Sequence, residues 1–585
     1  MRMDYLKLTE VYDALDKTTK RLEKTDIISK FLRAASKDDI PYIIPLLMGK
    51  IFIHGDEKHI GVSSRLVLKT LAYSTGINQE NIEKEWSKIG DLGEVAYNLI
   101  KIKKQTTLGS SHLTIKKVLT NIQQLADLVG EGTVSKKVSL MSELLTSATP
   151  IEAKYIARTI LEDLRVGTGE GTLRDAIVWA FLYKNIKYDL KENKILIDNR
   201  EEYNNYTEEV QHAYNLSSDF ADIIIKLKEK GGKSLKSLSL KSGSPIKVML
   251  YPKAKDLEDA FEQVGKPCAF EYKYDGFRML LHRDGDKFWL FTRRLDDVTK
   301  QFPDVVEIIK KNIRSNNYIL DSEVIGIDPK TKKWLPFQDI SQRIKRKYDI
   351  QKLVKDTPVM INVFDAIQID GRNLINIPFK ERRVSFKKII KEVPEKLQLA
   401  EQLVTDDLKK AEKFYEEALK KGNEGIMAKS LEGIYKPGSR VGYGVKVKPI
   451  LENLDLVITG AQWGEGKRAT WLSSFTLSCK DKDKFLEIGK VGTGIKEKEE
   501  GVSFKQLTDL LKPLVIISHG KTVEVKPKII IEIGYQEIQK SPTYNSGFAL
   551  RFPRVIQLRN DKPLGEISDL DYIKRIYTQQ KHKHK

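Results

Sequence analysis

The hydrophobic pattern of this chain changes near residue 248, so one fold class cannot describe all of it. Up to about residue 230, apolar residues recur every three or four positions, as in IPYIIPLLMGKIF, TIKKVLTNIQQLADLV and KKVSLMSELLTSA. This spacing is typical of amphipathic helices. From residue 248, short runs rich in β-branched and aromatic residues alternate with turn pairs such as Asp284–Gly285 and Asp370–Gly371, which predicts strands.

The chain has 585 residues, which is too long for a single hydrophobic core and predicts a multidomain protein. We expect an all-α domain over residues 1–230, and a linker over 231–247 because Lys, Ser and Gly dominate that stretch. An α+β domain built on antiparallel sheets is expected over 248–449. A small β-barrel of the oligonucleotide-binding (OB) kind, with a basic C-terminal tail, is expected over 450–585.

Individual elements are also predicted in the last two domains. Helices are expected at about 379–391, 406–421 and 503–512. Strands are expected in AFEY, FRMLLH, KFWLFTR, YILDSEVIGI and MINVFDAI of the α+β domain, and in LDLVITGAQW, SSFTLSC, FLEIGKV, TVEVKP and IIIEIGYQEI of the barrel.

The charge balance points to a polyanionic partner. Lys and Arg number 101 and Asp and Glu 81, an excess of 101 − 81 = 20. Cations that displace phosphate counterions favour binding to nucleic acid, although a basic surface that only aids solubility explains the excess as well. The charged N-terminus does not resemble a signal peptide, and no apolar stretch reaches the roughly eighteen residues of a membrane span. We therefore expect an intracellular, cytoplasmic protein.

Cysteine and histidine usage excludes two classes of site. The two cysteines, Cys268 and Cys479, are too few for a disulfide framework or a four-cysteine zinc site. We expect Cys268 to be a buried strand residue. His582 and His584, in the tail QQKHKHK, are expected to belong to a disordered basic end.

The tetrapeptide GEGT occurs twice in the helical part, at Gly130–Thr133 and Gly169–Thr172. The second copy follows the helical run Ala157–Val166 and opens a further helix, TLRDAIVWAFLY. Backbone N–H groups at a glycine-rich helix start can bind phosphate. A helix C-cap followed by an N-cap accounts for the same residues, so both interpretations remain open.

The most informative stretch is EYKYDGFR, residues 271–278. Lys273 ends a predicted strand, and Asp275–Gly276 turn the chain, which places the lysine amine at the mouth of a sheet. An amine attacks phosphorus only when it is neutral, so burial and neighbouring cations such as Arg278 would be needed to lower its pKa. A Lys-x-Asp-Gly turn also arises often by chance.

Further residues suited to nucleotide chemistry follow in order. They are Arg293 in FTRRLDD, Glu323 in LDSEVIG, Phe364 in NVFDAI, Glu424 in NEGIMAK, Lys446 and Lys448 in GVKVKP, and Arg551 and Lys562 in RFPRVIQLRNDK. Carboxylates can hold Mg²⁺, an aromatic ring can stack on a purine, and alternate strand lysines face the same way. Each residue alone could be a solvated acid or a core side chain, but their order favours nucleotidyl transfer.

This ordered set resembles the motifs of the covalent nucleotidyltransferase superfamily, which comprises DNA ligases, RNA ligases and mRNA capping enzymes. EYKYDGFR, EGIMAK and RFPR…DK are most similar to ATP-dependent DNA ligases of the archaeal and eukaryotic replicative type. The helical part, with DLRVGTGEGTLRDAI, is similar to the DNA-binding domain of that larger ligase type. The resemblance extends over almost the whole chain. It departs from the usual pattern at GYGVKVKP, because this motif more commonly begins with Trp-Leu-Lys in the family.

The resemblance implies a role for each motif residue. Lys273 is implied as the adenylated nucleophile, Glu271 as the reader of the adenine amino group, and Phe364 as the stacking ring. Arg278 and Arg293 are implied to contact phosphate or the 5′ end of a nick, Glu323 the ribose or a metal, and Glu424 a metal. Arg440, Lys446 and Lys448 are implied to bind the phosphates. Arg551 and Lys562 are implied to orient the leaving pyrophosphate. The residues implied to contact DNA are Arg165, Gly167, Gly169, Gly171 and Thr172.

The activity implied by the resemblance is nick sealing in duplex DNA. Lys273 takes AMP from ATP, AMP passes to the 5′-phosphate of the nick, and the 3′-hydroxyl then displaces it, with Mg²⁺ or Mn²⁺ as cofactor. Roles in DNA replication, repair, recombination and cell division follow from the family, as does a monomeric state. A sliding-clamp partner rests on resemblance only, because we find no Gln-x-x-hydrophobic-x-x-aromatic-aromatic motif.

Other functions were weighed against this one. An RNA capping enzyme would use GTP and would not need some 230 helical residues before its lysine. A non-catalytic DNA-binding relative would be expected to lose residues such as Lys273, Glu323 and Glu424, all of which are present. An NAD-dependent ligase would need a cysteine zinc finger that the chain does not have.

Overall fold

The computed structural model describes residues 3–52, 60–102, 112–128, 130, 132–237, 240–335, 337–346, 349–449, 452–464, 468, 470–497 and 501–582. The chain forms two compact units. The first comprises Met1–Tyr251, Gly276–Ala400 and Leu431–Tyr443, and the second comprises Pro252–Asp275, Glu401–Ser430 and Gly444–Lys585. The unit boundary passes through the expected α+β domain, and the division into three domains stays a prediction.

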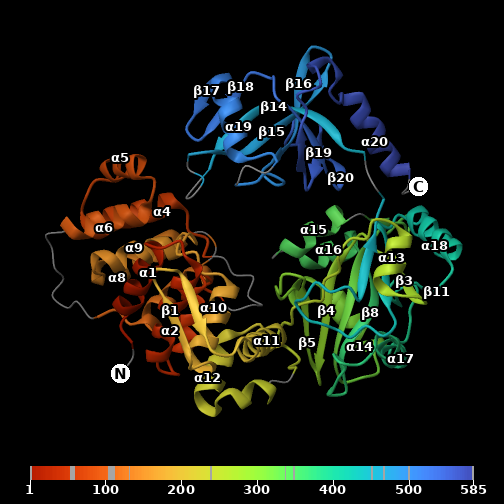
Figure 1. Ribbon diagram of the computed structural model, residues 1–585, viewed down its shortest axis with the longest axis horizontal. Helices are drawn as coiled ribbons and strands as arrows, with labels where there is room; N and C mark the ends of the chain where they lie inside the picture. The colour runs from red at the N-terminus through yellow and green to blue at the C-terminus, as the bar shows by residue number, and fades with distance from the viewer. Residues whose placement is uncertain are drawn as a thin grey trace. The chain divides into compact units, whose positions relative to one another are not determined.

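The N-terminal part of the first unit is helical, as expected (Figure 1). Its helices share a core that includes Tyr5, Ile28, Tyr155 and Leu173. They are α1 Tyr5–Asp16, α2 Arg21–Ala34, α3 Ile40–Leu47, α4 Ser64–Thr75, α5 Gln79–Ile89, α6 Leu92–Ile102, α7 Ile115–Asp127, α8 Thr133–Ser147, α9 Pro150–Ile160, α10 Glu170–Ile177, α11 Arg200–Ser217 and α12 Phe220–Lys230.

One β-hairpin lies within this helical part, which the expectation of an all-α domain did not include. It consists of β1, Ile186–Asp189, and β2, Lys194–Ile197, and follows a π-helical turn over Val178–Leu182 that continues α10. Ile186 and Ile195 pack against the helical core, whereas Lys187 and Leu196 are exposed. The alternation of apolar and polar residues with period two explains the hairpin.

The segment expected to be a linker packs into the first unit. It contains a 3₁₀-helix over Gly232–Ser237, and Leu240 and Ile246 are buried with Leu280 and Phe291. The Lys, Ser and Gly content suggested an open linker, but the few apolar residues in the stretch find a core.

The first unit also contains a sheet of order β10-β8-β6-β4-β5, with short strands β7 and β9 paired at its margins. Its pairs are antiparallel, as expected, except that β10 runs parallel to β8. The strands are β4 Phe277–Asp284, β5 Lys287–Thr292, β6 Asn317–Ile327, β7 Trp334–Leu335, β8 Val359–Ile369, β9 Arg372–Asn373 and β10 Leu397–Leu399.

Both faces of this sheet are covered within the unit. Met279 and Leu281 on β4 pack against α14, Pro303–Asn312, and α17, Phe379–Ile389. Leu280, from the opposite face of β4, lies in the cluster that holds Leu216 and Ile246. Helices α15, Phe337–Lys345, and α16, Ile350–Asp356, were not predicted from the sequence.

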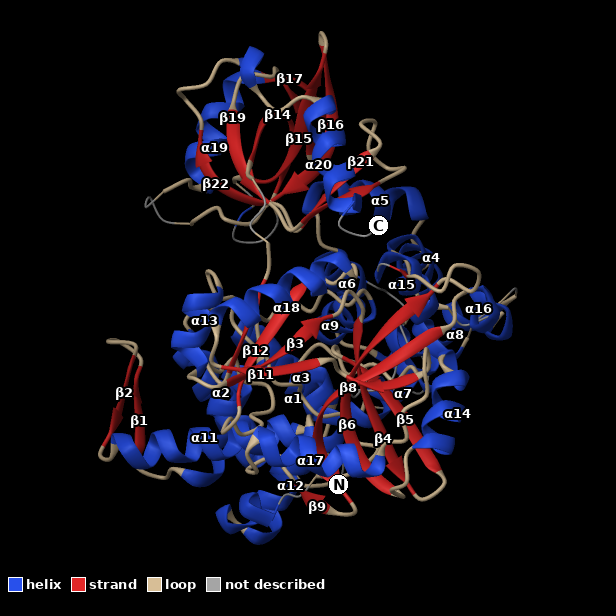
Figure 2. Ribbon diagram, turned by 90° about the vertical axis from the view of Figure 1, so that its right-hand side faces the viewer, coloured by secondary structure: helices blue, strands red, loops and turns tan. Residues whose placement is uncertain are grey.

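The second unit contains a four-stranded antiparallel sheet of order β11-β3-β12-β13. The strands are β11 Gln402–Thr405, β3 Cys268–Lys273, β12 Gly425–Ser430 and β13 Gly444–Val447. Helices α13, Leu257–Val264, and α18, Leu408–Lys420, lie beside these strands (Figure 2). Phe270 contacts Phe261 of α13, and Tyr272 stacks on Phe414 of α18. The face that carries Ala269, Glu271 and Lys273 is therefore the one turned away from the helices.

The C-terminal part of the second unit is strand-rich, as expected. Its main sheet has the order β16-β15-β14-β18-β17, and β19 pairs with both β14 and β22. A bulge between Ile458 and Gly460 lets β14 pair with β19 before the bulge and with β18 after it. The strands are β14 Leu454–Trp463, β15 Leu472–Asp481, β16 Lys484–Val491, β17 Val515–His519, β18 Thr522–Val525, β19 Ile530–Gly534, β20 Glu537–Lys540, β21 Phe548–Arg551 and β22 Arg554–Leu558.

Two helices flank these strands (Figure 1). Helix α19, Phe504–Leu511, was predicted. The tail QQKHKHK was expected to be disordered, but its residues up to His582 belong to helix α20, Leu570–His582, and Gln580 accepts a hydrogen bond from the backbone N–H of Ile538; His584 lies outside the described residues. Within the described ranges, no helix combines the length and apolar character that crossing a bilayer requires.

Candidate active site

Lys273 ends β3 in a small cluster of charged groups in the second unit. Its Nζ lies 2.9 Å from Oε2 of Glu424, and the Nζ of Lys448 pairs with the same oxygen. Burial by itself would raise the pKa of Glu424, but the ammonium groups of Lys273 and Lys448 outweigh it and lower the pKa. Burial, followed by repulsion from Lys273, lowers the pKa of Lys448. The cluster gathers three charges from β3, the start of β12 and the end of β13.

A glycine makes this cluster possible. Gly425, opposite Lys273 in the β3–β12 register, has φ of +144°. A Cβ at this position would lie 2.1 Å from the carbonyl oxygen of Val447, a distance that no side chain allows. The close approach of β12 to β13 brings Glu424 and Lys448 together, so the glycine of EGIMAK has a steric cause.

Glu271 lies on the same face of the sheet as Lys273, two residues earlier on β3. It is 1% exposed and pairs with Lys429, whose Nζ lies 2.5 Å from Oε2. Gln402 Nε2 donates to Oε1 at 2.9 Å. Lys446 is opposite Met427, which in turn is opposite Glu271, so the register places Lys446 on this face too. Lys429 ends the motif NEGIMAK but had no role assigned from the sequence, and Gln402 was not singled out.

Asp275 is an additional titratable group beside Lys273. Burial, followed by the carboxylates of Glu424 and Glu537, raises its pKa to about 6, while Arg551 and Lys273 act in the opposite direction. Arg551 Nη1 lies 3.1 Å from Oε2 of Glu537. Arg551, which is predicted to bind pyrophosphate, therefore acts electrostatically on Asp275, two positions after Lys273.

Lys562, the other predicted pyrophosphate ligand, is bound within the strand-rich part. It pairs with Asp455 of β14 at 2.5 Å, and Arg559 Nη1 donates to both oxygens of the same carboxylate at 2.9 Å. Asp455 is 9% exposed. Neither Asp455 nor Arg559 was predicted from the sequence. No local pattern marks Asp455, because its two partners lie more than 100 residues later.

Arg278 is enclosed by protein groups in the first unit. Its Nε donates to Asp321 at 2.8 Å and its Nη1 to the carbonyl oxygen of Met249 at 2.6 Å. The guanidinium carbon lies 5.3 Å from the ring centre of Phe364. In this arrangement Arg278 braces Phe364 and the β4–β6 pair; its assignment to phosphate stays a prediction.

The other predicted residues of the first unit lie on the same sheet or at its ends. Glu323 is half-buried on β6, opposite Arg278 on β4 and Asn362 on β8. Phe364 is half-buried, while Arg293 and Arg440 are exposed. Arg440 forms a backbone bridge to Leu250. The structure thus brings Arg278, Glu323 and Phe364 onto adjacent strands, and places Arg293 beyond the end of β5.

The predicted DNA-binding loop precedes α10. Gly169 is the N-cap of this helix and Thr172 is buried in its first turn. Arg165 has a positive φ of 61° and pairs with Asp163 and Asp91. The Oγ1 of Thr168 is buried and receives no hydrogen bond from the described residues. The cap interpretation is therefore correct for Gly169, and it leaves phosphate binding by the loop open.

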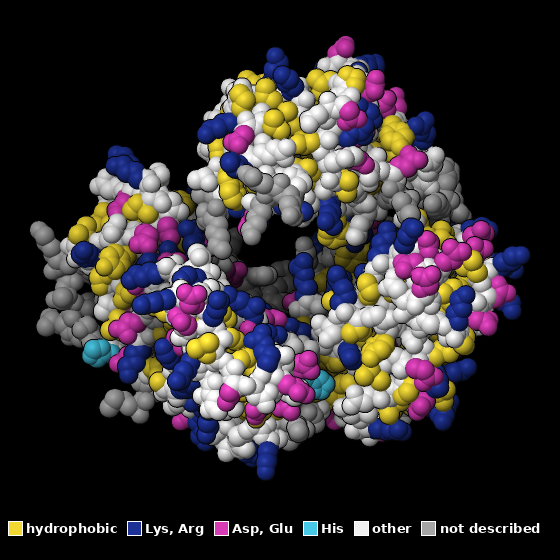
Figure 3. All heavy atoms as spheres, viewed as in Figure 1, with side chains coloured by type: hydrophobic (Ala, Val, Ile, Leu, Met, Phe, Trp, Pro, Cys, Tyr) yellow, Lys and Arg dark blue, Asp and Glu magenta, His cyan; other side chains and the backbone are white. Residues whose placement is uncertain are grey.

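Two cations of α2 adjoin this loop and were missed in the sequence. Lys24 Nζ donates to the carbonyl oxygen of Val166 at 2.5 Å, and Arg21 pairs with Asp175 of α10 at 2.6 Å. A Cβ added at Gly167 would lie 2.9 Å from Lys24 Nζ, and one at Gly171 would lie 3.2 Å from the Arg21 guanidinium. Figure 3 shows Lys and Arg side chains gathered over α2, α10 and β1, with acidic side chains among them.

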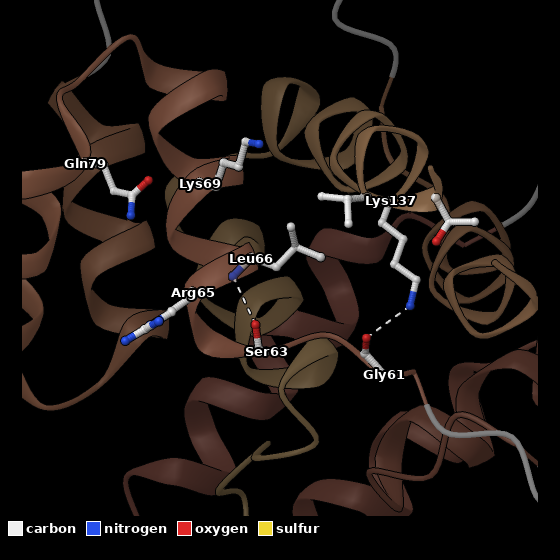
Figure 4. A pocket seen from close by; sticks show the side chains of 9 residues that line it. Gly61, Ser63, Arg65, Leu66, Lys69, Gln79 and Lys137 are labelled. Carbon is white, nitrogen blue, oxygen red and sulfur yellow. Dashed lines mark hydrogen bonds between the residues drawn. The ribbon is translucent and has the colours of Figure 1, made fainter. Parts of the chain in front are cut away.

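The two GEGT copies are not equivalent. The first copy places Gly132, with φ of 80°, before a helix that begins at Thr133, whereas the second begins its helix at Glu170; Glu131 lies outside the described residues. A cavity of about 490 Å³ adjoins the first copy (Figure 4). It is lined by Gly61, Ser63, Arg65, Leu66, Lys69, Gln79, Thr133, Val134 and Lys137, none of them a predicted site residue.

The residues that could hold a divalent metal are Glu323 of the first unit and Glu424 of the second. Among the described residues, no group of three or more His, Cys, Asp or Glu side chains forms a cluster for a metal ion. Mg²⁺ is commonly held by one or two carboxylates together with substrate phosphates. The chemistry of these donors therefore fits a metal that binds with a nucleotide, and not a dedicated protein cage.

Comparisons with known proteins agree with this geometry. The family models named DNA ligase N terminus, ATP dependent DNA ligase domain and ATP dependent DNA ligase C terminal region match residues 4–178, 248–448 and 468–562. The DNA ligase of Nanoarchaeum equitans is 44% identical over 584 residues, 99% of each chain. The DNA ligase of Thermococcus onnurineus is 40% identical over 578 residues, 98% of each chain.

A solved structure described as Pmar-Lig_PreS3 has a TM-score of 0.56 and covers 94% of this chain and 99% of its own. At 16% identity it shows a shared fold. The matches to DNA ligases over the full length set aside the capping enzyme and the non-catalytic relative as alternatives. The chain belongs to the family of ATP-dependent DNA ligases, the enzymes that form phosphodiester bonds at nicks in duplex DNA through an adenylate intermediate.

Proposed function

We propose that Lys273 is the residue that carries AMP. The observation that supports this most is its position at the end of β3, 2.9 Å from Glu424, with the Lys448 ammonium on the same carboxylate. Attack of the neutral Nζ on the α-phosphorus of ATP forms a P–N bond and breaks the bond to the bridging oxygen, so pyrophosphate leaves. The cations around Lys273 offset the negative charge that develops on the phosphate oxygens.

In this proposal each part of the nucleotide is bound by a motif residue. Phe364 stacks on the base, Glu271 accepts from the adenine amino group, and Glu323 binds the ribose or a metal. Arg440, Lys446 and Lys448 bind phosphates, and Arg551 and Lys562 orient pyrophosphate. The proposal is supported by the common face of Glu271, Lys273 and Lys446 on one sheet.

Glu323 and Glu424 would hold Mg²⁺, which offsets charge on the phosphate oxygens when it is bound. Both side chains are oxygen donors, the type that this cation prefers. Mg²⁺, a monomeric state, a cytoplasmic location and a sliding-clamp partner are otherwise expectations from the sequence.

Nicked duplex DNA is proposed to contact the loop before α10 through its phosphates. Arg165, Gly167 and Gly169 belong to this loop, Gly171 and Thr172 to the first turn of α10. Arg21 and Lys24 extend the positive surface of the loop. Gly167 and Gly171 lie against these cations without a side chain of their own, which lets a phosphate approach the backbone closely. Contacts of this kind bind with little sequence preference and weaken steeply as salt rises.

The first test replaces Lys273 by Arg. A guanidinium keeps the positive charge but does not deprotonate, so no AMP adduct should form when the variant is incubated with ATP. Binding to nicked duplex should stay within about twofold, because DNA contacts depend on other cations. Mass spectrometry of the intact protein detects the adduct, and Lys420→Arg, an exposed lysine at the end of α18, is the matched control. An adduct in Lys273→Arg would show that another residue is the nucleophile.

A further inference from the structure

The carboxylate of Glu271 is bound by two side chains from the neighbouring strands. Lys429 Nζ lies 2.5 Å from one oxygen, and Gln402 Nε2 donates to the other at 2.9 Å. Gln402 on β11 is opposite Glu271, and Lys429 on β12 is two residues after Met427, which is opposite Glu271 from the other side. Each carboxylate oxygen is therefore held by a different strand.

This ion pair is poorly explained by stability alone. Glu271 is 1% exposed and Lys429 is 3% exposed. Removing two charges from water costs several kcal/mol, and an apolar pair of similar volume is often as stable or more stable. The pair orients the Glu271 carboxylate, a hydrogen-bond acceptor on the face that carries Lys273. Recognition of a ligand therefore explains the pair better than a contribution to folding does.

The position of the pair suits contact with a base. Glu271 precedes Lys273 by two residues on β3, so their Cα atoms lie about 7 Å apart along one face. A nucleotide whose α-phosphorus meets Lys273 Nζ extends its ribose and base away from that atom over the same face. The proposed function already assigns the amino group of the base to Glu271, and the present inference rests on that assignment.

We propose that Lys429 and Gln402 are positioning residues that hold the Glu271 carboxylate in one orientation and thereby set the preference for a 6-aminopurine nucleotide over a 6-oxopurine one. An ionised carboxylate only accepts hydrogen bonds. It attracts the N–H of a 6-amino group and repels the oxygen of a 6-oxo group. The Lys429 ammonium holds one oxygen of Glu271 and the Gln402 amide holds the other, so the two contacts together fix the rotation of the carboxylate.

The test measures self-adenylation of the full chain with three nucleotides: ATP, GTP, and purine riboside triphosphate, which has no group at position 6. In Lys429→Met, kcat/KM for ATP should fall about ten- to a hundredfold, the value of a hydrogen bond to a charged group. The value for the purine analogue should change little. KM should change more than kcat, because the base is remote from the reacting phosphorus. Gln402→Leu should show a smaller effect of the same kind.

Two further variants guard against misfolding. Glu271→Gln/Lys429→Met leaves no unpaired buried charge, and its amide can donate to a 6-oxo group, so its preference for ATP over GTP should fall at least tenfold. The single variant Lys429→Arg, which keeps a cation beside Glu271, should retain most of the preference for ATP over GTP that the intact chain has. Lys413→Met, an exposed lysine on α18, is the matched control and should keep the intact preference.

Equal losses with all three nucleotides, or an unchanged ratio of ATP to GTP in the double variant, would overturn the inference and leave a structural role. Failure of the intact chain to label with ATP would instead contradict the proposed function. The two failures are therefore distinguishable in one set of assays.

Discussion

At the scale of single residues, the site depends on positions where only one residue type fits. Gly425 has a positive φ, and a Cβ there would meet the carbonyl oxygen of Val447. Gly276 in the first unit is similarly restricted, since a Cβ added there would lie 2.3 Å from the carbonyl oxygen of Val324. These glycines flank Glu424 and Asp275 in the sequence, and their backbones let strands approach where charged side chains must meet.

Gly425→Ala should therefore disrupt the Lys273 cluster. The added methyl cannot be accommodated without moving β12 away from β13, at a cost of about 3 kcal/mol or more. We expect a lower midpoint of thermal unfolding and a large loss of self-adenylation.

Gly442→Ala is the matched control for this variant. Gly442 does not have a positive φ, and a Cβ added there would meet no atom within 4 Å. Its replacement should therefore change stability by less than about 1 kcal/mol. Equal stability of the two variants, measured by differential scanning calorimetry, would contradict the steric account of Gly425.

At the scale of elements, a few strand pairings collect residues that are far apart in the chain. The sheet β11-β3-β12-β13 joins segments between residues 268 and 447, and its register puts Gln402, Glu271 and Lys446 on one face. Helices α13 and α18 cover the opposite face. In the strand-rich part, α20 completes the core from the last segment that the structure describes.

Ile573→Ala tests the contribution of α20. Ile573 is fully buried in the strand-rich core, and removing a buried isoleucine side chain to Ala costs about 2–5 kcal/mol. We expect the urea midpoint of this variant to fall clearly. Lys574→Ala, which changes an exposed neighbour on the same helix, should stay within about 0.5 kcal/mol of the intact chain. Indistinguishable midpoints for the two variants would mean that α20 adds little to the core.

At the scale of the whole molecule, the predicted site residues divide between two units. Lys273 and Arg551 belong to the second, and Arg278 and Phe364 to the first, with the chain crossing between Asp275 and Gly276. Arg551 contributes to the electrostatics of Asp275. Cations that align pyrophosphate opposite the attacking amine are needed in the first step only. We expect the strand-rich part to move once AMP is attached, about the segment near residues 448–453, of which 450 and 451 lie outside the described residues.

This account predicts a split between two assays. Arg551→Ala and Lys562→Ala should each slow self-adenylation with ATP by at least about a hundredfold. Sealing of a nick that already carries 5′-AMP, assayed without ATP, should fall by less than about tenfold. Lys540→Ala, an exposed lysine on the strand paired with β21, is the matched control. Equal losses in both assays would assign these residues to DNA binding or folding.

The sequence by itself determined the fold classes, most strands and the order of the motifs, because periodicity and turn chemistry are local and the motifs keep their spacing; the role of Lys273 as nucleophile stays a prediction. Tertiary structure alone decided the partners. Asp455 binds Arg559 and Lys562 from more than 100 residues away, Gln402 and Lys429 hold Glu271 through strand register, and Lys24 reaches the loop before α10. Such contacts carry no local pattern, since they depend on which strands pair and which helices pack. The segment 231–247 shows the same limit, because its composition suggested an open linker where a few apolar residues found a core.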